Sequence, residues 1–182
     1  KKSSANVTLK INAATAANDS QIQFATGDSA DWLIGVDGSA TNDPLKFYDY
    51  ASSSNVLELN NGNVGIGASP LGTHADFTSL TLGGNGYFHH NTAAGASKGL
   101  HIAQNANYDT DGSWEYVSTD EASNYYQSGG VHGFRVVASG TGGNDISWTE
   151  VLKLDSNSRI SLSNNDSGGD GGGDSTSGNT LM

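Results

Sequence analysis

The stretch VLELNNGNVGIG, residues 56–67, contains two short apolar runs separated by asparagine and glycine. The first run is VLEL, and the second places Val64 and Ile66 between glycines. Asn61 and Gly62 accept the positive φ values that a tight hairpin turn requires. The stretch therefore predicts a β-hairpin whose turn contains these two residues.

Residues 151–162 repeat this plan near the other end of the chain. The run VLKL is followed by a turn at residues 155–158 and then by Ile160 and Leu162. Upstream residues match as well: 32–37 with 134–138, and Leu45 and Phe47 with Ile146 and Trp148. Each copy is a small sheet that cannot close a core alone, and such repeats are typical of stacked or intertwined architectures.

Short runs with period-2 alternation recur along the chain and predict an all-β fold. Gly, Asn, Asp or Ser bounds each run, as turn residues do. Besides the two hairpins, the predicted strands lie at residues 6–12, 22–24, 32–36, 45–47, 80–82, 100–102, 134–137 and 146–148. Only residues 118–123 have a helical pattern, which predicts a single turn with Ser118 or Thr119 as its N-cap.

The composition indicates that the chain depends on partner chains for its core. Hydrophobic residues make up 35% of the chain, and glycine occupies 25 of its 182 positions. Chains with so few apolar residues usually need metals, disulfides or other chains to offset their conformational entropy. The chain contains no cysteine, which excludes disulfides. Association with copies of itself is the leading alternative.

The charge balance opposes two classes of partner. Nineteen acidic residues against eight basic ones give a formal net charge of -11. This charge disfavours binding to nucleic acid and to anionic lipid. No stretch approaches the roughly 20 apolar residues that a membrane-spanning helix requires. Nucleic-acid binding and membrane insertion are therefore not expected.

Composition and repeats divide the chain into four predicted segments. Residues 1–70 form a first β module that ends in the GNVGIG hairpin, and residues 71–113 form a connecting β segment. Residues 114–163 form a second β module that repeats the first. Residues 164–182 form a linker rich in Gly, Asp and Ser, which cannot pack a core and leads into a further C-terminal region. The chain is thus interpreted as a piece of a longer polypeptide.

Three stretches resemble the distal shaft of bacteriophage tail-fibre proteins. VLELNNGNVGIGASP, residues 56–70, is similar to the motif L-x-L/I-D-x-x-G-N-V-G-I-G-x-x-S-P of these fibres. Residues 114–166 resemble the module that such fibres place before a C-terminal intramolecular chaperone domain. Residues 179–181 resemble the start of their N-T-x-x-G repeats.

The resemblance implies a parallel homotrimer in the tail fibre of a virion, where it extends or presents the host-attachment apparatus. It also implies contacts with other tail or fibre proteins, and a downstream chaperone domain, often cleaved off, that assists trimer assembly. The second hairpin departs from the family, with Ser158, Arg159 and Ser161 where the pattern has Gly, Asn and Gly. Composition by itself would also allow two or four chains.

The two hairpins contain the residues that we expect to pack between chains. Glycines at alternate positions remove one side of a strand's side chains, which lets another backbone approach while apolar residues face a shared centre. The residues concerned are Val64, Gly65, Ile66, Gly67, Leu154, Ile160 and Leu162.

Metal ligands are sparse, and no cofactor is predicted. Asp109 and Asp111 resemble the start of a calcium loop, but their sequence DTDGS fits a hairpin turn leading into a strand better. His89 and His90 are adjacent, so on a strand they point to opposite faces and cannot hold one ion within one chain. In a trimer, one of them could meet its symmetry mates on the axis. These four residues are the metal candidates.

The sequence favours a structural protein over an enzyme. It has no cysteine nucleophile, and serine is so abundant that a serine near a histidine or an aspartate carries almost no information about catalysis. A polysaccharide depolymerase would need a pair of facing carboxylates with perturbed pKa in a groove. An exposed aromatic cluster would instead favour binding of a host-surface glycan, which is the alternative function. The aromatic residues proposed for stacking on a glycan are Trp114, Tyr116, Tyr125 and Tyr126.

Overall fold

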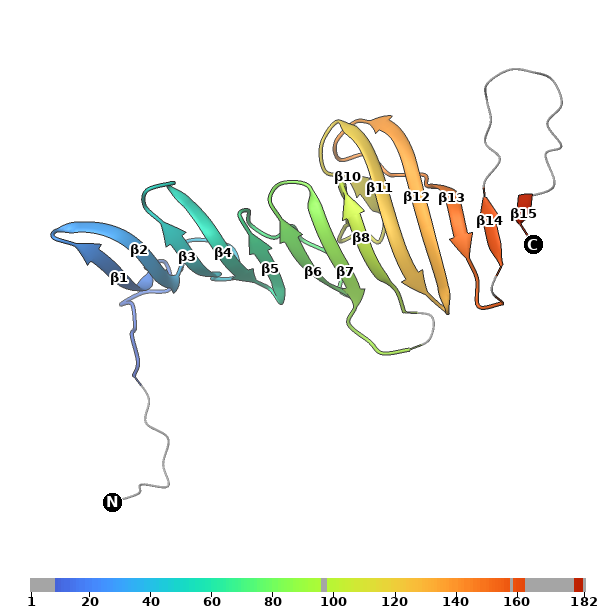
Figure 1. Ribbon diagram of the computed structural model, residues 1–182. Helices are drawn as coiled ribbons and strands as arrows, with labels where there is room; N and C mark the ends of the chain where they lie inside the picture. The colour runs from blue at the N-terminus through green and yellow to red at the C-terminus, as the bar shows by residue number, and fades with distance from the viewer. Residues whose placement is uncertain (1–8, 96–97, 158, 163–178, 182) are drawn as a thin grey trace.

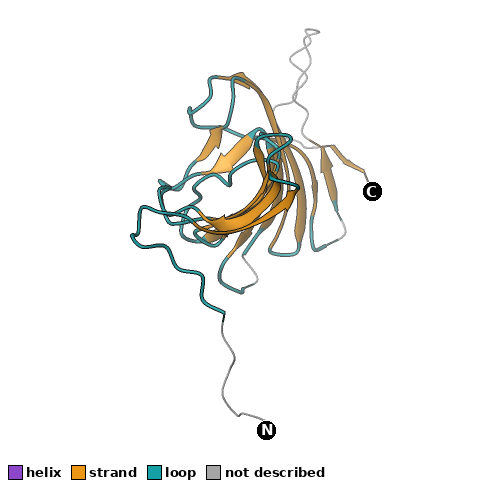
Figure 2. Cartoon of the chain, turned by 90° about the vertical axis from the view of Figure 1, so that its left-hand side faces the viewer, coloured by secondary structure: helices purple, strands orange, loops and turns teal. Residues whose placement is uncertain are grey.

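A computed structural model describes residues 9–95, 98–157, 159–162 and 179–181 of the chain. These residues form one 13-stranded sheet and a separate pair of short strands (Figure 1), which confirms the predicted all-β fold class. Viewed from the side (Figure 2), the large sheet is a single curved layer. The described residues include no helix whose length and apolar character would allow it to span a bilayer.

The strands follow one another across the sheet in the order of the sequence. The first five strands form consecutive antiparallel pairs. They are β1 (Ser20–Thr26), β2 (Ser29–Val36), β3 (Leu45–Asp49), β4 (Ser54–Asn60) and β5 (Asn63–Ile66). The pairing of β5 with β6 is parallel, and residues 67–76 form the crossover between them.

The second half continues the sheet with antiparallel pairs. Its strands are β6 (Phe77–Leu82), β7 (Gly86–Asn91), β8 (Leu100–Gln104), β11 (Asp120–Ser128), β12 (Val131–Gly140), β13 (Thr149–Leu154), β14 (Ile160–Leu162) and β15 (Asn179–Leu181). Two short strands, β9 (Ala106–Tyr108) and β10 (Trp114–Tyr116), leave this order and pair with each other. Because β8 therefore pairs directly with β11, the large sheet remains continuous.

Both predicted hairpins are present. In the first, Leu59 pairs with Val64, and the turn residues Asn61 and Gly62 have φ values of 48° and 80°. These positive values explain why asparagine and glycine occupy the turn. In the second, Leu154 pairs with Ile160 across the β13–β14 turn.

The repeat does not extend upstream as predicted. In the first copy, Leu45 and Phe47 belong to β3, which lies between β2 and β4 in the sheet. In the second copy, Ile146 and Trp148 form no strand, and β12 pairs directly with β13. These two side chains pack instead against the core cluster on one face of the sheet. The prediction of a strand at residues 146–148 is therefore wrong, because tertiary packing diverts these residues.

Two further local predictions are wrong. Residues 120–123 belong to strand β11, so the predicted helical turn at residues 118–123 does not form. Cross-strand pairing with β8 and β12 on both sides overrides the weak capping pattern. The predicted strand at residues 6–12 also fails where it can be assessed, since residues 9–12 have no strand conformation. Residues 6–8 lie outside the described part of the chain, as does most of the predicted linker at 164–182.

The buried core lies on one face of the sheet, between the sheet and the β9–β10 pair. Its fully buried members come from β7, β8, β9, β10 and β11: Tyr87, Ala103, Ala106, Tyr116 and Ala122. We call this side of the sheet the opposite face, and the other side the apolar face. Strands β7 and β11 went unpredicted because Tyr87 and Phe88, and likewise Tyr125 and Tyr126, place aromatic residues on both faces and hide the period-2 pattern.

Candidate functional site

The apolar face carries a row of large side chains that are register partners across ten strands. Each residue is paired with the next in the neighbouring strand: Val36, Leu45, Leu59, Val64, Leu80, Phe88, Ile102, Tyr125, Phe134 and Leu152. At a strand spacing of about 4.8 Å, this row is roughly 40 Å long. Directly opposed residues share a face, so the row is a continuous apolar ladder.

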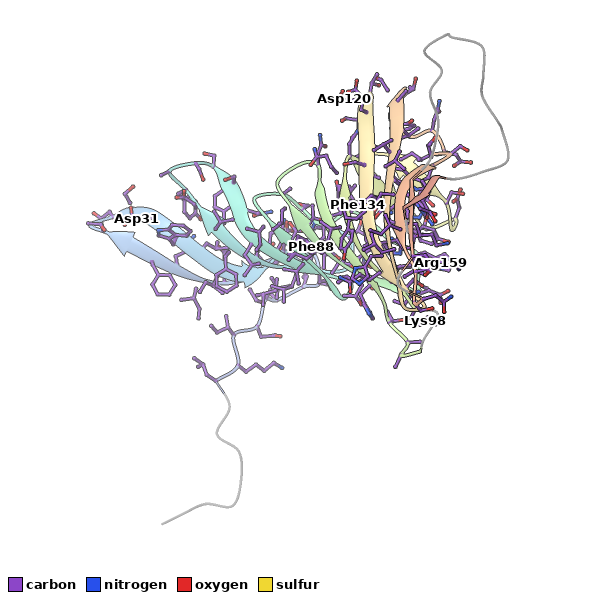
Figure 3. All side chains as sticks on the ribbon, turned by 45° about the vertical axis from the view of Figure 1, so that its right-hand side comes forward. Asp31, Phe88, Lys98, Asp120, Phe134 and Arg159 are labelled. Atoms are coloured by element: carbon purple, nitrogen blue, oxygen red, sulfur yellow. The ribbon has the colours of Figure 1, made fainter. Side chains whose placement is uncertain are left out.

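A second row runs beside the first over β1–β6. Its members are Ile22, Ile34, Phe47, Leu57, Ile66 and Leu82. Neither row contains Asp, Glu, Lys or Arg. Figure 3 shows charged side chains at the ends of the strands, such as Asp120 and Lys98, with Phe88 and Phe134 between them. The middle of the apolar face, along these two rows, is therefore uncharged.

These apolar side chains are exposed to an unusual degree. Leu59 is 41% exposed, and Ile102 and Phe134 are each 40% exposed. Ile66 reaches 47%. Single exposed apolar residues are ordinary on protein surfaces, but a contiguous patch marks an interaction site or an aggregation hazard.

Most of the residues predicted to pack between chains lie on this face. Val64 and Ile66 belong to its two rows, and Leu154 and Ile160 are register partners beside the first row. Leu162 pairs with Leu152 at the backbone.

The two glycines of the first hairpin act differently from the prediction. A β-carbon on Gly65 would lie 2.1 Å from the carbonyl oxygen of Ala68 and 2.9 Å from Pro70 Cδ. The backbone that approaches Gly65 thus belongs to the same chain, in the crossover to β6. Gly67 has a φ of 71° and begins this crossover. The absent side chain of Gly65 thus accommodates the chain's own turn on the opposite face, whereas a β-carbon on Gly67 would meet only Gly83 Cα, at 4.0 Å.

The crossover also closes the opposite face around a buried carboxylate. Glu58 is only 3% exposed. Its side chain accepts hydrogen bonds from Ser69 Oγ at 2.7 Å and from Asn55 Nδ2 at 2.9 Å. These bonds satisfy a charged group that would otherwise be costly to bury.

An aromatic and histidine cluster fills the space between the sheet and the β9–β10 pair. His89 stacks on Tyr87 with ring centroids 5.6 Å apart, and Trp114 contacts His89 edge-on at 5.5 Å. His101 is the register partner of His89 and lies 5.1 Å from Trp114. Burial also raises the pKa of Tyr87 to about 12. This cluster joins the two layers into one packed unit.

The structure corrects the predicted glycan-stacking residues. Tyr116 and Tyr126 are 6% and 7% exposed, so their rings are packing residues rather than surface platforms. Trp114 is half-buried within the cluster. Tyr125 lies on the apolar face, where its ring is 4.9 Å from Phe134 and its hydroxyl is 2.6 Å from His132 Nδ1. These four residues do not form one exposed aromatic surface.

The histidine candidates for a metal site are separated as predicted. His89 is fully buried on the opposite face, and His90 is exposed on the apolar face. Burial lowers the pKa of His89 to about 4, and the neighbouring His101 acts in the same direction. Burial likewise lowers the pKa of His101 to about 4 against the opposing hydrogen bond from Asn124. Because it is buried within its own chain, His89 cannot meet symmetry mates on an axis.

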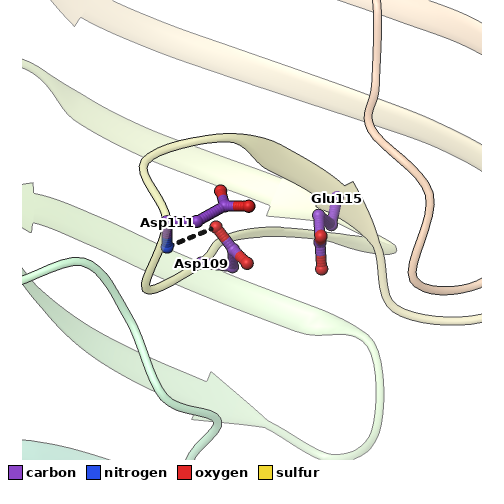
Figure 4. Close-up of side chains that lie close together, drawn as sticks. All are labelled: Asp109, Asp111 and Glu115. Carbon is purple, nitrogen blue, oxygen red and sulfur yellow. Dashed lines mark hydrogen bonds between the residues drawn. The ribbon is translucent and has the colours of Figure 1, made fainter.

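The acidic candidates lie in the turn that joins β9 to β10 (Figure 4), as the hairpin interpretation predicts. One ligand atom from each of Asp109, Asp111 and Glu115 lies within 4.8 Å of the others. Asp109 Oδ1 accepts the backbone N–H groups of Asp111 at 3.0 Å and Ser113 at 3.3 Å. The carboxylate is therefore already engaged in stabilising the turn.

Crowding of charge perturbs these carboxyl groups. The hydrogen bond shared with Asp109 is the main cause that raises the pKa of Asp111. Partial burial, followed by the charges of Asp109 and Asp111, raises the pKa of Glu115. Burial alone would raise the pKa of Asp109, but its hydrogen bonds outweigh burial and lower it. The turn explains these shifts without a substrate, because both aspartates project from an exposed hairpin end.

Sequence reasoning missed Asn105, which joins the sheet to the turn before β11. It is 1% exposed and has a φ of 55°. Its Nδ2 donates to the carbonyl oxygens of Ser118 and Glu121, both at 3.0 Å. Its Oδ1 accepts from the backbone N–H and the hydroxyl of Ser118, both at 2.8 Å. The side-chain amide therefore has a partner for each of its hydrogen-bonding groups. In the sequence, only the position of Asn105 between two apolar strands would have indicated that it joins the sheet to this turn.

A shallow groove of about 440 Å³ lies on the opposite face of β1–β4, a region that no second layer of described residues covers. Tyr48 and Tyr50 line it, with their rings edge to face at 5.1 Å. Lys46 Nζ lies 2.5 Å from Asp37 Oδ2, and this hydrogen bond lowers the pKa of Asp37 to about 2. The groove therefore combines a half-buried and an exposed tyrosine ring with a charged pair.

Comparison with known proteins provides no further assignment: no protein-family description and no curated protein sequence matches this chain.

Proposed function

We propose that this chain is a structural segment of a homotrimeric bacteriophage tail fibre, in which the apolar face forms the shared core. The observation that carries the proposal is the uncharged apolar ladder across ten strands. As part of the virion, the segment extends or presents the host-attachment apparatus. It is not an enzyme in this proposal.

The large sheet is a single layer (Figure 2). A sheet is stable in water when at least one of its faces packs against another element. The chain covers part of the opposite face with β9–β10 and with the crossover at residues 67–76, but it places no second layer on the described apolar face. Copies of the same chain offer the matching surface, since each carries the same ladder. The number three comes from the resemblance of residues 56–70, 114–166 and 179–181 to tail-fibre shafts.

The strand order supports an elongated assembly. Because strands follow one another in sequence order, the chain advances along one direction, perpendicular to its strands. A shared core built on the ladder would have its axis along this direction. The formal net charge of -11 is compatible with close packing of three chains, because the rows that would meet contain no charged residue. The charged residues lie outside these rows, and dissolved salt screens the repulsion between those that are exposed.

The oligomeric state tests the proposal. Sedimentation or light scattering of the purified fibre segment should give three times the chain mass of 18.7 kDa. Dilution should cause dissociation and unfolding together, because folding and association form one equilibrium in such assemblies. A compact monomer of 18.7 kDa that unfolds cooperatively would contradict the proposal.

A second candidate function is recognition of a host-surface glycan, and the groove on the opposite face of β1–β4 favours it. In a trimer with the apolar faces inside, this groove would lie on the outside. Tyr48 and Tyr50 offer apolar rings with hydroxyl groups, and Asp37 and Lys46 offer hydrogen-bonding partners for sugar hydroxyls. Replacing both tyrosines by alanine should abolish binding to an array of bacterial surface polysaccharides without changing the oligomer. Unchanged binding would remove the groove from consideration.

A further inference from the structure

Strand β1 leaves one edge of the large sheet open. Among the described residues, β1 pairs only with β2. Its sequence SQIQFAT contains no charged residue and no proline, which are the usual devices that protect a sheet edge from unwanted pairing. Ile22 and Phe24 are 43% and 51% exposed on this edge. The edge is therefore suited to accept another strand.

Residues 9–12, which a short connection joins to β1, have the pattern of such a strand but no strand pairing. Leu9 and Ile11 alternate with Lys10 and Asn12. Leu9 is 84% exposed and Ile11 is 45% exposed. The residues from 9 to 12 have neither strand pairing nor a turn conformation. The sequence thus provides an alternating segment that the sheet has not incorporated.

The connection between this segment and β1 already brings their ends together. Ala13 N donates to Ser20 Oγ at 2.9 Å, which places the end of the segment beside the first residue of β1. Within the connection, Asn18 N donates to the carbonyl oxygen of Thr15 at 3.1 Å. Gly38 N donates to Asp19 Oδ1 at 3.2 Å, which ties the connection to the β2–β3 turn. Figure 1 shows the segment leaving the molecule from this end of β1.

We propose that residues 9–12 fold back onto the free edge of β1 as an additional antiparallel strand. Starting from the contact of Ala13 with Ser20, antiparallel register places Ile11 opposite Ile22 and Leu9 opposite Phe24. Both apolar residues then fall on the apolar face. Ile11 extends the row that begins with Ile22.

The register is specified by the side-chain pattern. In this alignment Lys10 lies opposite Gln23 on the opposite face, so polar residues meet polar residues. A slip by one residue would place Leu9 and Ile11 on the wrong face. The six residues between Ala13 and Ser20 form a loop slightly longer than the commonest hairpin loops. The chain's own segment is the favoured occupant because its attachment point is already in place.

This added strand covers the unprotected edge and lengthens the apolar face at its N-terminal end. It extends the surface on which the proposed fibre core rests, but the pairing does not depend on the number of chains. In a fibre, it would give the sheet a defined N-terminal edge strand.

Disulfide trapping tests the pairing and its register. The chain has no cysteine, so the double variant Lys10→Cys with Gln23→Cys contains only the two engineered thiols. Directly opposed residues of adjacent strands lie within the Cα separation that a disulfide spans. The matched control is Lys10→Cys with Phe24→Cys, in which the second thiol faces the other side of the sheet. Both variants are first checked for an unchanged circular dichroism spectrum.

The expected result is rapid disulfide formation within one chain in the 10/23 variant, with the 10/24 variant remaining reduced at least tenfold longer. Free-thiol titration and non-reducing electrophoresis measure both. Equal rates in the two variants would overturn the proposal, because an unpaired segment has no preferred face. No disulfide in either variant would also overturn it. Disulfide-linked dimers in the 10/23 variant would overturn the own-chain assignment and make a second copy the occupant.

Discussion

The ring of Tyr126 lies on Gly133, its register partner in strand β12, so closely that a β-carbon at position 133 would be 2.1 Å from Tyr126 Cε1. The same ring lies 4.0 Å beneath the guanidinium of Arg135, and its hydroxyl donates to Glu150. Glycine at position 133 thus allows the tyrosine ring to pack directly over strand β12. The missing side chain of a glycine in one strand leaves the space that a large aromatic ring of the neighbouring strand fills.

We expect Gly133→Ala to destabilise the protein, although alanine is normally the better strand residue. The added methyl group would force Tyr126 out of its position, and overpacking of this kind costs about 1–3 kcal/mol. Thermal unfolding should show a melting temperature lowered by several degrees. Gly84→Ala is the matched control, because a β-carbon there meets nothing within 4 Å. Equal melting temperatures for the two variants would contradict the role given to Gly133.

Stability should fall as the pH is lowered from about 6.5 towards 4, because His89 and His101 are held neutral by burial. Their pKa values of about 4 in the folded protein lie below the ordinary value of 6.5. Between these values the unfolded chain binds more protons than the folded one, so acid favours unfolding. The stabilisation is complete above pH 6.5 and is limited to the order of 3 kcal/mol for each histidine.

Chemical denaturation at a series of pH values measures this effect. The variant His89→Phe keeps an aromatic ring in the cluster but cannot be protonated there. Its unfolding free energy should depend less steeply on pH between 6.5 and 4 than that of the wild type. The same pH dependence in both proteins would show that His89 does not control acid stability.

Replacing Val64 and Ile66 by aspartate should abolish assembly of the proposed fibre. Ile66 is 47% exposed in the single chain, so a carboxylate there is costly only if another chain covers it. Size-exclusion chromatography with light scattering should show loss of the oligomer. Gln21→Glu with Gln23→Glu adds two charges to the opposite face and should leave the oligomer intact. A normal oligomer from the aspartate variant would refute the assignment of this face.

Chelation of metal ions should leave the melting temperature within about 5 °C of its untreated value, a range that corresponds to about 1–3 kcal/mol for a chain of this size. The reason is that hydrogen bonds within the turn already engage Asp109, and that His89 is enclosed by aromatic rings. A larger decrease would identify the acidic turn as a cation site. In that case Asp111→Asn should make the protein insensitive to the chelator.

Local patterns predicted much of the secondary structure but little of the buried cluster. The β4–β5 hairpin was predictable because Asn61 and Gly62 specify a turn and the flanking residues alternate, and both signals are local. Strands β7 and β11 gave no such signal, since each presents large side chains to both faces. The position of Trp148 was also unpredictable, because its contact with Trp114 at 5.9 Å joins separate segments of the chain.

The amino-acid sequence by itself determined that this protein is all-β and built from short hairpins. It also determined that the chain has too few apolar residues to form a self-sufficient core. These properties follow from composition and from period-2 alternation, which neighbouring residues specify. Only the tertiary structure decided that Leu59, Ile102 and Phe134 belong to one row and that His89 lies opposite His101. Such relationships depend on strand order and register, and a shift of one residue in either strand would place the same side chains on different faces.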